Sequence, residues 1–144
     1  MGQWRGCAGR QRVSKGRVMD QAVLTKKRIL IADDEPSIRL LYERELRKEG
    51  YELFFALSGQ DAVRLARELK PDLVVLDIRM PEMDGIQALH RLLEEQNSLP
   101  VVINTAYSSY KDNFLCWAAE AYLVKSSELT ELKDTIRFLL NRSN

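Results

Sequence analysis

Five polar residues along this chain each follow a short apolar run of the β type. The acid pair Asp33 and Asp34 follows residues 28–32, Asp77 follows residues 73–76, Thr105 follows residues 101–104, and Lys125 follows residues 121–124. In open parallel sheets the ligand site lies outside the carboxyl ends of the strands. We therefore expect three carboxylates, one hydroxyl and one ammonium group to gather at one edge of one sheet.

This set of groups suits a divalent cation together with a phosphoryl group. Asp33, Asp34 and Asp77 offer hard oxygen ligands, which Mg²⁺ takes in small number alongside water and phosphate oxygens. Repulsion among three facing carboxylates is costly unless positive charge neutralises it, and Lys125 and a metal would supply that charge. A carboxylate can also attack a phosphoryl group and form an acyl phosphate. Asp77, alone at the end of its strand, is the natural nucleophile.

Strand-like and helix-like segments alternate from residue 28 onward. The apolar runs predict strands over residues 28–32, 51–56, 72–76, 100–104 and 120–124. Apolar residues at three and four spacing predict helices from about Pro36 to Gly50, from a Ser58 cap to Lys70, over about residues 86–96, and over about residues 128–140 with Ser126 or Ser127 as the cap. A further helix is expected in the aromatic and polar segment 107–118. This alternation is typical of a doubly wound α/β domain with a parallel sheet.

The composition fits one cytoplasmic domain. At 144 residues the chain can bury a real hydrophobic core without a disulfide. Its two cysteines, Cys7 and Cys116, lack the spacing of metal ligands, and no signal peptide is recognisable, so a reducing compartment is expected. No apolar stretch approaches the roughly 20 residues of a membrane-spanning helix, and no membrane role is expected.

Charge divides the chain into a basic tail, residues 1–27, and an acidic domain, residues 28–144. The tail holds seven Lys and Arg against the single acid Asp20, and the domain holds fifteen against twenty acids, although the net charge of the whole chain is only +1. The tail shows no apolar period, so we expect it to be disordered. Nucleic-acid binding is not expected of the domain. A start at Met19 is an alternative that would remove most of the tail.

Four stretches of the sequence resemble the receiver domain of two-component response regulators. They are residues 31–35 (IADDE), 76–85 (LDIRMPEMDG), 105–106 (TA) and 122–125 (YLVK). The resemblance covers residue 28 to about residue 141, and the marks occur in the family's order. It implies a stand-alone receiver with a flavodoxin-like fold, in which five parallel strands lie in the order 2-1-3-4-5, numbered along the chain, and pack with five helices.

The resemblance also implies a role for each residue of the cluster. By position, the phosphoacceptor would be Asp77, the groups that bind the phosphoryl oxygens would be Thr105 and Lys125, and the switch aromatic would be Tyr122. The Mg²⁺ ligands would be Asp33, Asp34, Asp77 and the backbone carbonyl of Arg79.

The family's partners and output follow from the same resemblance. The phosphoryl donor would be a phosphohistidine on a sensor histidine kinase or on a histidine phosphotransfer protein. The signal would leave through the face formed by the fourth helix, the fifth strand and the fifth helix, where a homodimer contact would also form. Such a protein catalyses only its own phosphorylation and dephosphorylation, so it is not expected to be an enzyme that turns over a metabolite.

The chain departs from the family's pattern at two places. Ser126 stands where the family usually has a proline that follows a cis bond, and a cis bond without proline would cost about 3 kcal/mol. Ala118 and Ala119 replace the usual Gly-Ala pair, which removes a residue suited to the left-handed conformation at a helix end. We therefore expect the loop after the fifth strand and the end of the fourth helix to differ from the family's.

Two other functions are open to a sequence of this kind. A phosphatase with an aspartyl nucleophile would carry Asp-x-Asp, but Arg79 occupies the position of the second acid. A binding module that works without phosphorylation is argued against by the intact set of five site residues.

Some residues have two interpretations. His90, the one histidine, is expected to be solvated rather than to donate a phosphoryl group. The stripe of Tyr110, Phe114 and Trp117 is expected to lie in the core, with an exposed contact patch as the alternative.

Overall fold

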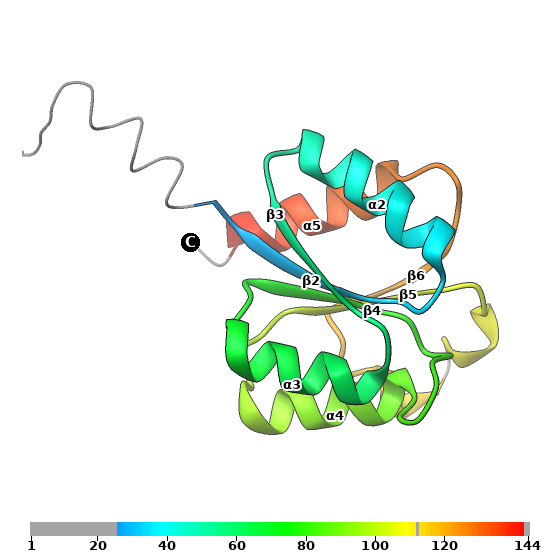
Figure 1. Ribbon diagram of the computed structural model, residues 1–144. Coiled ribbons are helices and arrows are strands. Elements are labelled where there is room, and N and C mark those ends of the chain that lie inside the picture. The colour runs from blue at the N-terminus through cyan, green and yellow to red at the C-terminus, as the bar shows by residue number, and fades with distance from the viewer. Residues whose placement is uncertain (1–25, 112, 143–144) are drawn as a thin grey trace, which may run out of the picture.

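The computed structural model describes residues 26–111 and 113–142 and shows one five-stranded sheet (Figure 1). The strands are β2 (Arg28–Ala32), β3 (Glu52–Ala56), β4 (Leu73–Leu76), β5 (Val101–Thr105) and β6 (Ala121–Val124). All pairings are parallel, and the order β3-β2-β4-β5-β6 is the predicted 2-1-3-4-5. The flavodoxin-like α/β fold is confirmed. The predicted disorder of the tail falls almost entirely on residues 1–25, which lie outside the described residues.

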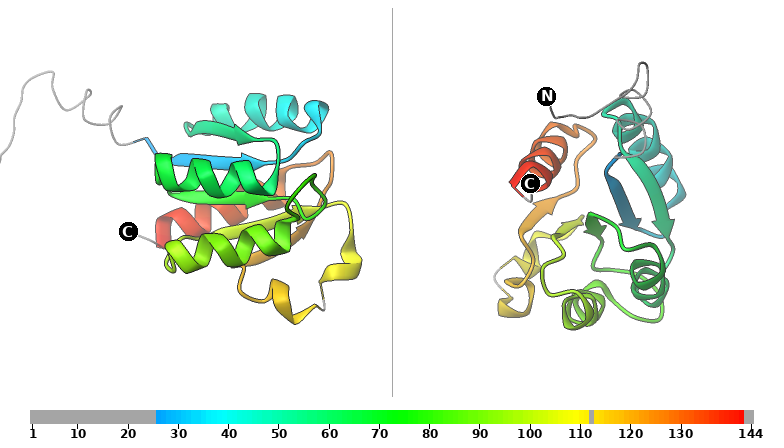
Figure 2. Two further views of the ribbon diagram at one scale, coloured as in Figure 1. Left: turned by 60° about the horizontal axis from the view of Figure 1, so that its bottom comes forward. Right: turned by 90° about the vertical axis from the view of Figure 1, so that its left-hand side faces the viewer.

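The sheet is buried on both faces because successive strand residues point to opposite sides. Leu30 and Ala32 pack with one core cluster, while Ile29 and Ile31 pack with the other. Helices α3 (Gly59–Leu69) and α4 (Gly85–Glu95) cover the first face, and α2 (Pro36–Lys48) and α5 (Thr130–Arg142) cover the second (Figures 1 and 2). The helix layers cover the two faces of the sheet and leave the ends of its strands accessible.

The helices begin and end where local chemistry favours it. Pro36 occupies the first turn of α2, where its missing N–H costs little, and Gly50 adopts a φ of +93° just after that helix. The Ser58 side chain accepts a hydrogen bond from the Asp61 amide at 3.0 Å, as the predicted cap requires. Asp84 caps α4 in the same way through the Gln87 amide. None of the described helices combines the length and hydropathy needed to span a lipid bilayer.

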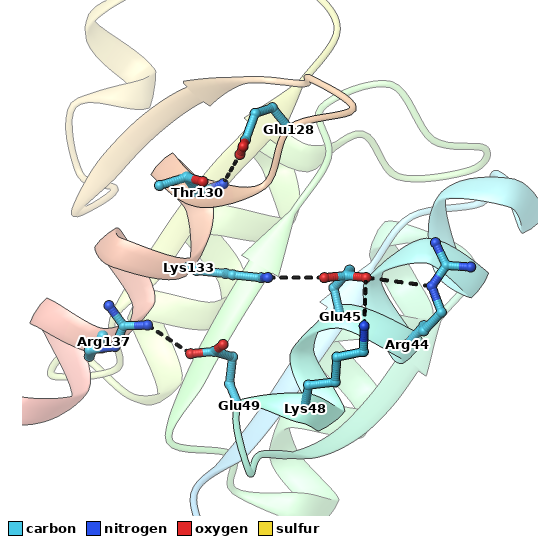
Figure 3. Close-up of polar contacts among 8 residues, drawn as sticks. All are labelled: Arg44, Glu45, Lys48, Glu49, Glu128, Thr130, Lys133 and Arg137. Carbon is cyan, nitrogen blue, oxygen red and sulfur yellow. Dashed lines mark hydrogen bonds and ion pairs between the residues drawn. The ribbon is translucent and has the colours of Figure 1, made fainter.

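Ion pairs join α2 and α5 on the outer side of the second face (Figure 3). Lys133 lies 3.0 Å from the Glu45 carboxylate, and Arg137 lies 2.7 Å from that of Glu49. The hydrogen bond from Lys133 lowers the pKa of Glu45. The Lys133 and Glu45 side chains are each only 23% exposed, whereas Arg137 is 50% exposed, so solvent screens the Arg137–Glu49 pair more strongly than the Lys133–Glu45 pair. Their effect is to fix the relative alignment of two helices that are far apart in the sequence.

The prediction of five helices is wrong in one element. Within the described part of segment 107–118, the chain forms two short 3₁₀ turns, Ser108–Tyr110 and Phe114–Cys116, and the described residues hold four α-helices. Phe114 and Trp117 are 68% and 72% exposed, so the aromatic stripe provides no continuous buried face for a helix. The core interpretation fails for these two side chains, whereas Tyr110 does pack against the core.

Helix α5 begins two residues later than predicted. The Ser126 hydroxyl accepts a hydrogen bond from the Glu128 amide. The Glu128 carboxylate accepts one from the Thr130 amide (Figure 3). The carboxylate therefore satisfies a free N–H of the first turn in place of the predicted serine cap. The described residues contain no cis peptide bond, so Ser126 follows Lys125 through a trans bond.

A buried polar pair links the two sides of the second core cluster. Tyr42 of α2 is 1% exposed, and its hydroxyl accepts a hydrogen bond from the side-chain amide of Asn104 in β5. Burial raises the pKa of Tyr42 to about 12. The phenol therefore stays neutral near pH 7, and the bond gives Asn104 a partner inside an otherwise apolar layer.

We expect Tyr42→Phe to lower the free energy of unfolding by about 1 to 3 kcal/mol, because it leaves the buried Asn104 amide without its acceptor. Urea denaturation at neutral pH measures the change. Tyr51→Phe is the matched control, since Tyr51 packs against the same cluster but is only partly buried. Equal losses in the two variants would contradict this role for the pair.

Candidate functional site

The carboxyl ends of four adjacent strands bring the predicted cluster together, at the right-hand side of the sheet in Figure 1. Asp33 and Asp34 follow β2, Asp77 follows β4, Thr105 ends β5, and Lys125 follows β6. The parallel register aligns these ends. The Asp77 amide donates to the Ala32 carbonyl at 3.0 Å, and the Lys125 amide donates to the Thr105 carbonyl at 2.7 Å. The common edge expected from the sequence is present.

Lys125 lies between two of the carboxylates. Its Nζ is 2.7 Å from Asp33 Oδ2 and 2.9 Å from Asp77 Oδ2, and Glu35 lies farther away at 3.8 Å. Burial by itself lowers the pKa of Lys125, but the hydrogen bonds to Asp33 and Asp77 outweigh it and raise the pKa well above the usual range. The ammonium group therefore stays charged at neutral pH and offsets part of the repulsion between the carboxylates.

Asp33 is held in place from several directions. It is 2% exposed, its Oδ1 accepts from the Glu35 amide at 3.0 Å, and the Arg39 guanidinium donates to its backbone carbonyl. Burial raises the pKa of the Asp33 carboxyl, while hydrogen bonds from Lys125 and from the Glu35 amide lower it in part. The buried carboxylate is therefore less easily ionised than an exposed one.

Two buried polar atoms at this edge stand apart from the rest of the described chain. Asp77 Oδ1 and the Thr105 hydroxyl oxygen have no hydrogen-bond partner, and they are the only such buried side-chain atoms among the described residues. Buried polar groups in native proteins almost always have a partner. Asp77 Oδ1 can only accept a hydrogen bond or bind a positive centre, whereas the Thr105 hydroxyl can donate a hydrogen bond. Together they fit a ligand that has both a positive centre and acceptor oxygens.

The carboxylates also fit a metal ion. One oxygen from each of Asp33, Asp34 and Asp77 lies within 4.8 Å of the others. Asp33 and Asp77 are buried, whereas Asp34 is exposed and leaves the site open to solvent. An all-oxygen donor set of this size, open on one side, is typical of Mg²⁺ sites that keep several waters. The role of the Arg79 carbonyl stays a prediction.

Tyr122 lies in β6 beside this edge. Its side chain is partly buried against the first core cluster, and its hydroxyl donates a hydrogen bond to the backbone carbonyl of Tyr107. Tyr107 lies two residues after Thr105, so this bond ties β6 to the chain that leaves β5. The role of Tyr122 as a switch stays a prediction.

Two glycines position the loop after β4, and sequence reasoning gave them no such role. A Cβ on Gly85 would lie 2.2 Å from the Asp77 carbonyl oxygen, and one on Gly59 would lie 2.1 Å from the Met83 carbonyl oxygen. The Gly85 amide also donates to the Ile78 carbonyl at 2.7 Å. The signal available in the sequence was Gly85 directly after the capping residue Asp84.

His90 is exposed, as predicted, and lies on α4. Its Nε2 is 3.0 Å from the Leu115 carbonyl oxygen. It lies outside the cluster formed by Asp33, Asp34, Asp77, Thr105 and Lys125.

Comparison with known proteins assigns the chain to a family. The response regulator receiver domain family matches residues 29–137, which is most of the chain. The chain belongs to this family. Receiver domains are phosphoacceptor domains rather than conventional enzymes, and the acidic pocket of Asp33, Asp34 and Asp77 occupies the position expected for that activity.

Solved receiver structures support the assignment. The response regulator protein TrrA from Thermotoga maritima, in complex with Mg²⁺-BeF, is 40% identical, covers 78% of this chain and 98% of its own, and gives a TM-score of 0.77. A CheY-like receiver domain protein from Methanospirillum hungatei is 26% identical, with 82% and 96% covered and a TM-score of 0.78.

The curated relatives of this receiver domain are longer proteins. The transcriptional regulatory protein PrrA from Mycobacterium tuberculosis is 40% identical over 126 residues, which are 86% of this chain and 54% of PrrA. The chain thus spans about half the length of the curated relatives it matches first.

We expect Gly85→Ala to destabilise the receiver domain by about 1 to 3 kcal/mol or more, because the added methyl would collide with the backbone that carries Asp77. Gly50→Ala is the control, since its Cβ would meet nothing within 4 Å and it would suffer only the strain of a positive φ. Urea denaturation measures both variants. A loss in Gly85→Ala no larger than that in Gly50→Ala would show that the close approach is unimportant.

Proposed function

We propose that this receiver domain accepts a phosphoryl group on Asp77 from a phosphohistidine of a sensor histidine kinase or a histidine phosphotransfer protein. An oxygen of the Asp77 carboxylate attacks phosphorus, the P–N bond to the imidazole breaks, and the imidazole leaves with its electron pair and takes up a proton. The product is an acyl phosphate on Asp77. Catalysis of this transfer requires mainly positioning and stabilisation of charge.

The observation that carries the proposal is the unpartnered pair of atoms, Asp77 Oδ1 and the Thr105 hydroxyl. Lys125 holds the other Asp77 oxygen at 2.9 Å, so the side chain is fixed while one oxygen remains unengaged. A phosphoryl group on Asp77 would give the Thr105 hydroxyl an acceptor oxygen. Lys125 would then pair with phosphoryl oxygens through charge-assisted hydrogen bonds.

The residues present fit Mg²⁺, for which we propose Asp33, Asp34, Asp77 and the Arg79 carbonyl as ligands. The three carboxylate oxygens within 4.8 Å of one another support this set, as does the Mg²⁺-BeF complex of TrrA. Bound there, the metal supplies positive charge that counters the carboxylates and the incoming phosphoryl oxygens. Without the metal, the ammonium group of Lys125 is, among the described residues, the one positive charge in contact with these carboxylates, which carry three negative charges when ionised.

The proposed partner is supported by a related complex. TrrA from Thermotoga maritima has also been solved with the histidine kinase ThkA, and in that complex it is 40% identical to this chain with a TM-score of 0.75. We propose a kinase of the same class, or a phosphotransfer protein, as the donor for this chain. We also propose that the reaction takes place in the cytoplasm, which agrees with the cysteine usage of the sequence.

We propose the surface made by residues 107–111 and 113–118, β6 and α5 as the output face and as a homodimer contact. Thr105 and Tyr122 would be its two-state element, because the Thr105 hydroxyl would be drawn toward the phosphoryl group while Tyr122 holds the Tyr107 carbonyl. The exposure of Phe114 and Trp117 on this segment supports a role in contacts.

We expect acetyl phosphate and Mg²⁺ to add a single phosphoryl group to the wild-type protein and none to Asp77→Asn. Intact-mass spectrometry under native-like, non-acidic conditions reads the result. Asp134→Asn is the control, because Asp134 lies on α5 and its side chain is 63% exposed. Equal labelling of wild type and Asp77→Asn would contradict the assignment of Asp77.

We expect Mg²⁺ affinity to fall as the pH is lowered, and to begin falling at a higher pH than it would if Asp33 had the pKa of an exposed aspartate. Mg²⁺ requires the carboxylate form, and burial raises the pKa of Asp33, so protons compete for this ligand earlier as the pH falls. Isothermal titration calorimetry between about pH 7 and about pH 5 tests this. In Asp33→Asn the affinity should be lower at neutral pH and less dependent on pH. A wild-type affinity that is flat across this range would refute the prediction.

A further inference from the structure

Arg79 has an unusual partner for a cation beside an acidic site. Its guanidinium carbon lies 4.3 Å from the centre of the Tyr107 ring, and Tyr110 meets Tyr107 edge to face, with ring centres 6.5 Å apart. A hydrogen bond with Tyr110 raises the pKa of Arg79. Within residues 26–111 and 113–142, Arg79 forms no salt bridge with a carboxylate, whereas Arg64, Arg67, Arg137 and Arg142 all do. Its charge is therefore not committed to an anion.

The same side chain is within reach of the phosphoacceptor. Arg79 lies two residues after Asp77, so their Cα atoms are at most about 7 Å apart, which a long arginine side chain can span. Arg79, Asp34 and Tyr110 line one hollow beside the loop after β4. Arg79 is exposed, so no packed core holds its side chain in one place.

The charges of the phosphorylated site favour a further cation beside Mg²⁺ and Lys125. Replacing the Asp77 carboxylate by an acyl phosphate would leave about four negative charges on this group, Asp33 and Asp34 taken together. Mg²⁺ and Lys125 supply three positive charges. Glu35, 3.8 Å from Lys125, adds further negative charge at the rim. The uncommitted guanidinium of Arg79 would add a fourth positive charge, which matches the four negative charges of the acyl phosphate, Asp33 and Asp34.

We propose that the Arg79 side chain is an additional phosphoryl-binding group, which the Tyr107 ring holds away from the site until Asp77 is phosphorylated. The proposal rests on the proposed phosphorylation of Asp77. A cation stacked on an exposed ring is held weakly, whereas a guanidinium can donate two charge-assisted hydrogen bonds to phosphoryl oxygens. The added phosphoryl group therefore competes successfully with the ring.

The movement of Arg79 from the Tyr107 ring to the phosphoryl group would transmit the effect of phosphorylation to β6. The backbone carbonyl of Tyr107 accepts the hydrogen bond of the Tyr122 hydroxyl, so the residue that Arg79 leaves is the residue that holds Tyr122. Tyr107 thus connects the loop after β4 to β6 by a route that does not pass through the Thr105 hydroxyl. Arg79 acts on phosphoryl oxygens directly, and Tyr107 is a positioning residue.

The test is a double-mutant cycle on the binding of beryllofluoride in the presence of Mg²⁺, measured by calorimetry on the full chain. Arg79→Gln should weaken binding about tenfold, because a charge-assisted pair is lost. Tyr107→Leu should tighten binding about twofold to fourfold, because the competing ring is gone. Tyr107→Leu in the Arg79→Gln background should change nothing. Tyr51→Leu, which alters a tyrosine outside the site, is the control.

A second measurement follows Arg79 itself. In the free wild type, the Arg79 Nε–H resonance should show an upfield ring-current shift that disappears in Tyr107→Leu. Mg²⁺ with beryllofluoride should move that resonance downfield in the wild type. Mg²⁺ alone should leave it in place.

The outcomes separate the two levels of the proposal. If beryllofluoride fails to bind the wild type, the proposed function fails. If it binds, but Tyr107→Leu has the same effect with and without Arg79, or the Arg79 resonance keeps its ring-current shift in the complex, the role of Arg79 is overturned while phosphorylation of Asp77 stands.

Discussion

The contact of Lys125 with Asp33 and Asp77 is the interaction on which the site depends. Two ionised carboxylates about 4 to 5 Å apart near a protein surface repel each other by a few kcal/mol, and three acids meet at this edge of the sheet. Lys125 touches two of them at 2.7 and 2.9 Å and stays charged. It thereby keeps the cluster assembled, yet it leaves Asp77 Oδ1 without a partner. Lys125 thus offsets part of the charge repulsion, while one carboxylate oxygen of Asp77 is left without a hydrogen-bond partner.

The sheet supplies the rigidity that this arrangement needs. Both faces of the central strands are buried under helix pairs, so the ends of β2, β4, β5 and β6 cannot shift independently. Gly85 allows the start of α4 to press against the backbone of Asp77. The side chains at the rim are held less firmly by packing, since Arg79 is exposed and lies against the Tyr107 ring. The buried Asp77 thus lies beside exposed side chains that no core packing holds in place.

Much of this was predictable from the sequence because it depends on periodicity and strand ends. Alternating apolar runs predicted the five strands and their polar termini, and the edge that gathers Asp33, Asp77 and Lys125 follows from parallel topology. Segment 107–118 was not predictable in the same way. Its aromatic spacing resembled a buried stripe, but Phe114 and Trp117 face solvent, and periodicity alone does not say which side of a segment is covered.

Contacts between distant residues were the other gap. The stacking of Arg79 on Tyr107 and the bond between Tyr42 and Asn104 each join residues on different elements. Asn104 did carry a signal, since it is a polar residue inside an apolar strand, but its partner on α2 could be found only in three dimensions. The start of α5 was displaced by two residues, because the Ser126 hydroxyl accepts from the Glu128 amide and the Glu128 carboxylate, not a serine, accepts from the Thr130 amide of the first turn.

The central claim is that Asp77 Oδ1 and the Thr105 hydroxyl are unpartnered because they are the points at which a phosphoryl group binds. A crystal structure of the full chain with Mg²⁺ and beryllofluoride tests it most directly. We expect beryllium bonded to an Asp77 carboxylate oxygen, the Thr105 hydroxyl donating to a fluorine, Lys125 turned toward another fluorine, and Mg²⁺ on Asp33 and Asp34. Beryllofluoride on a different carboxylate, or a Thr105 hydroxyl that still lacks a partner in the complex, would contradict it.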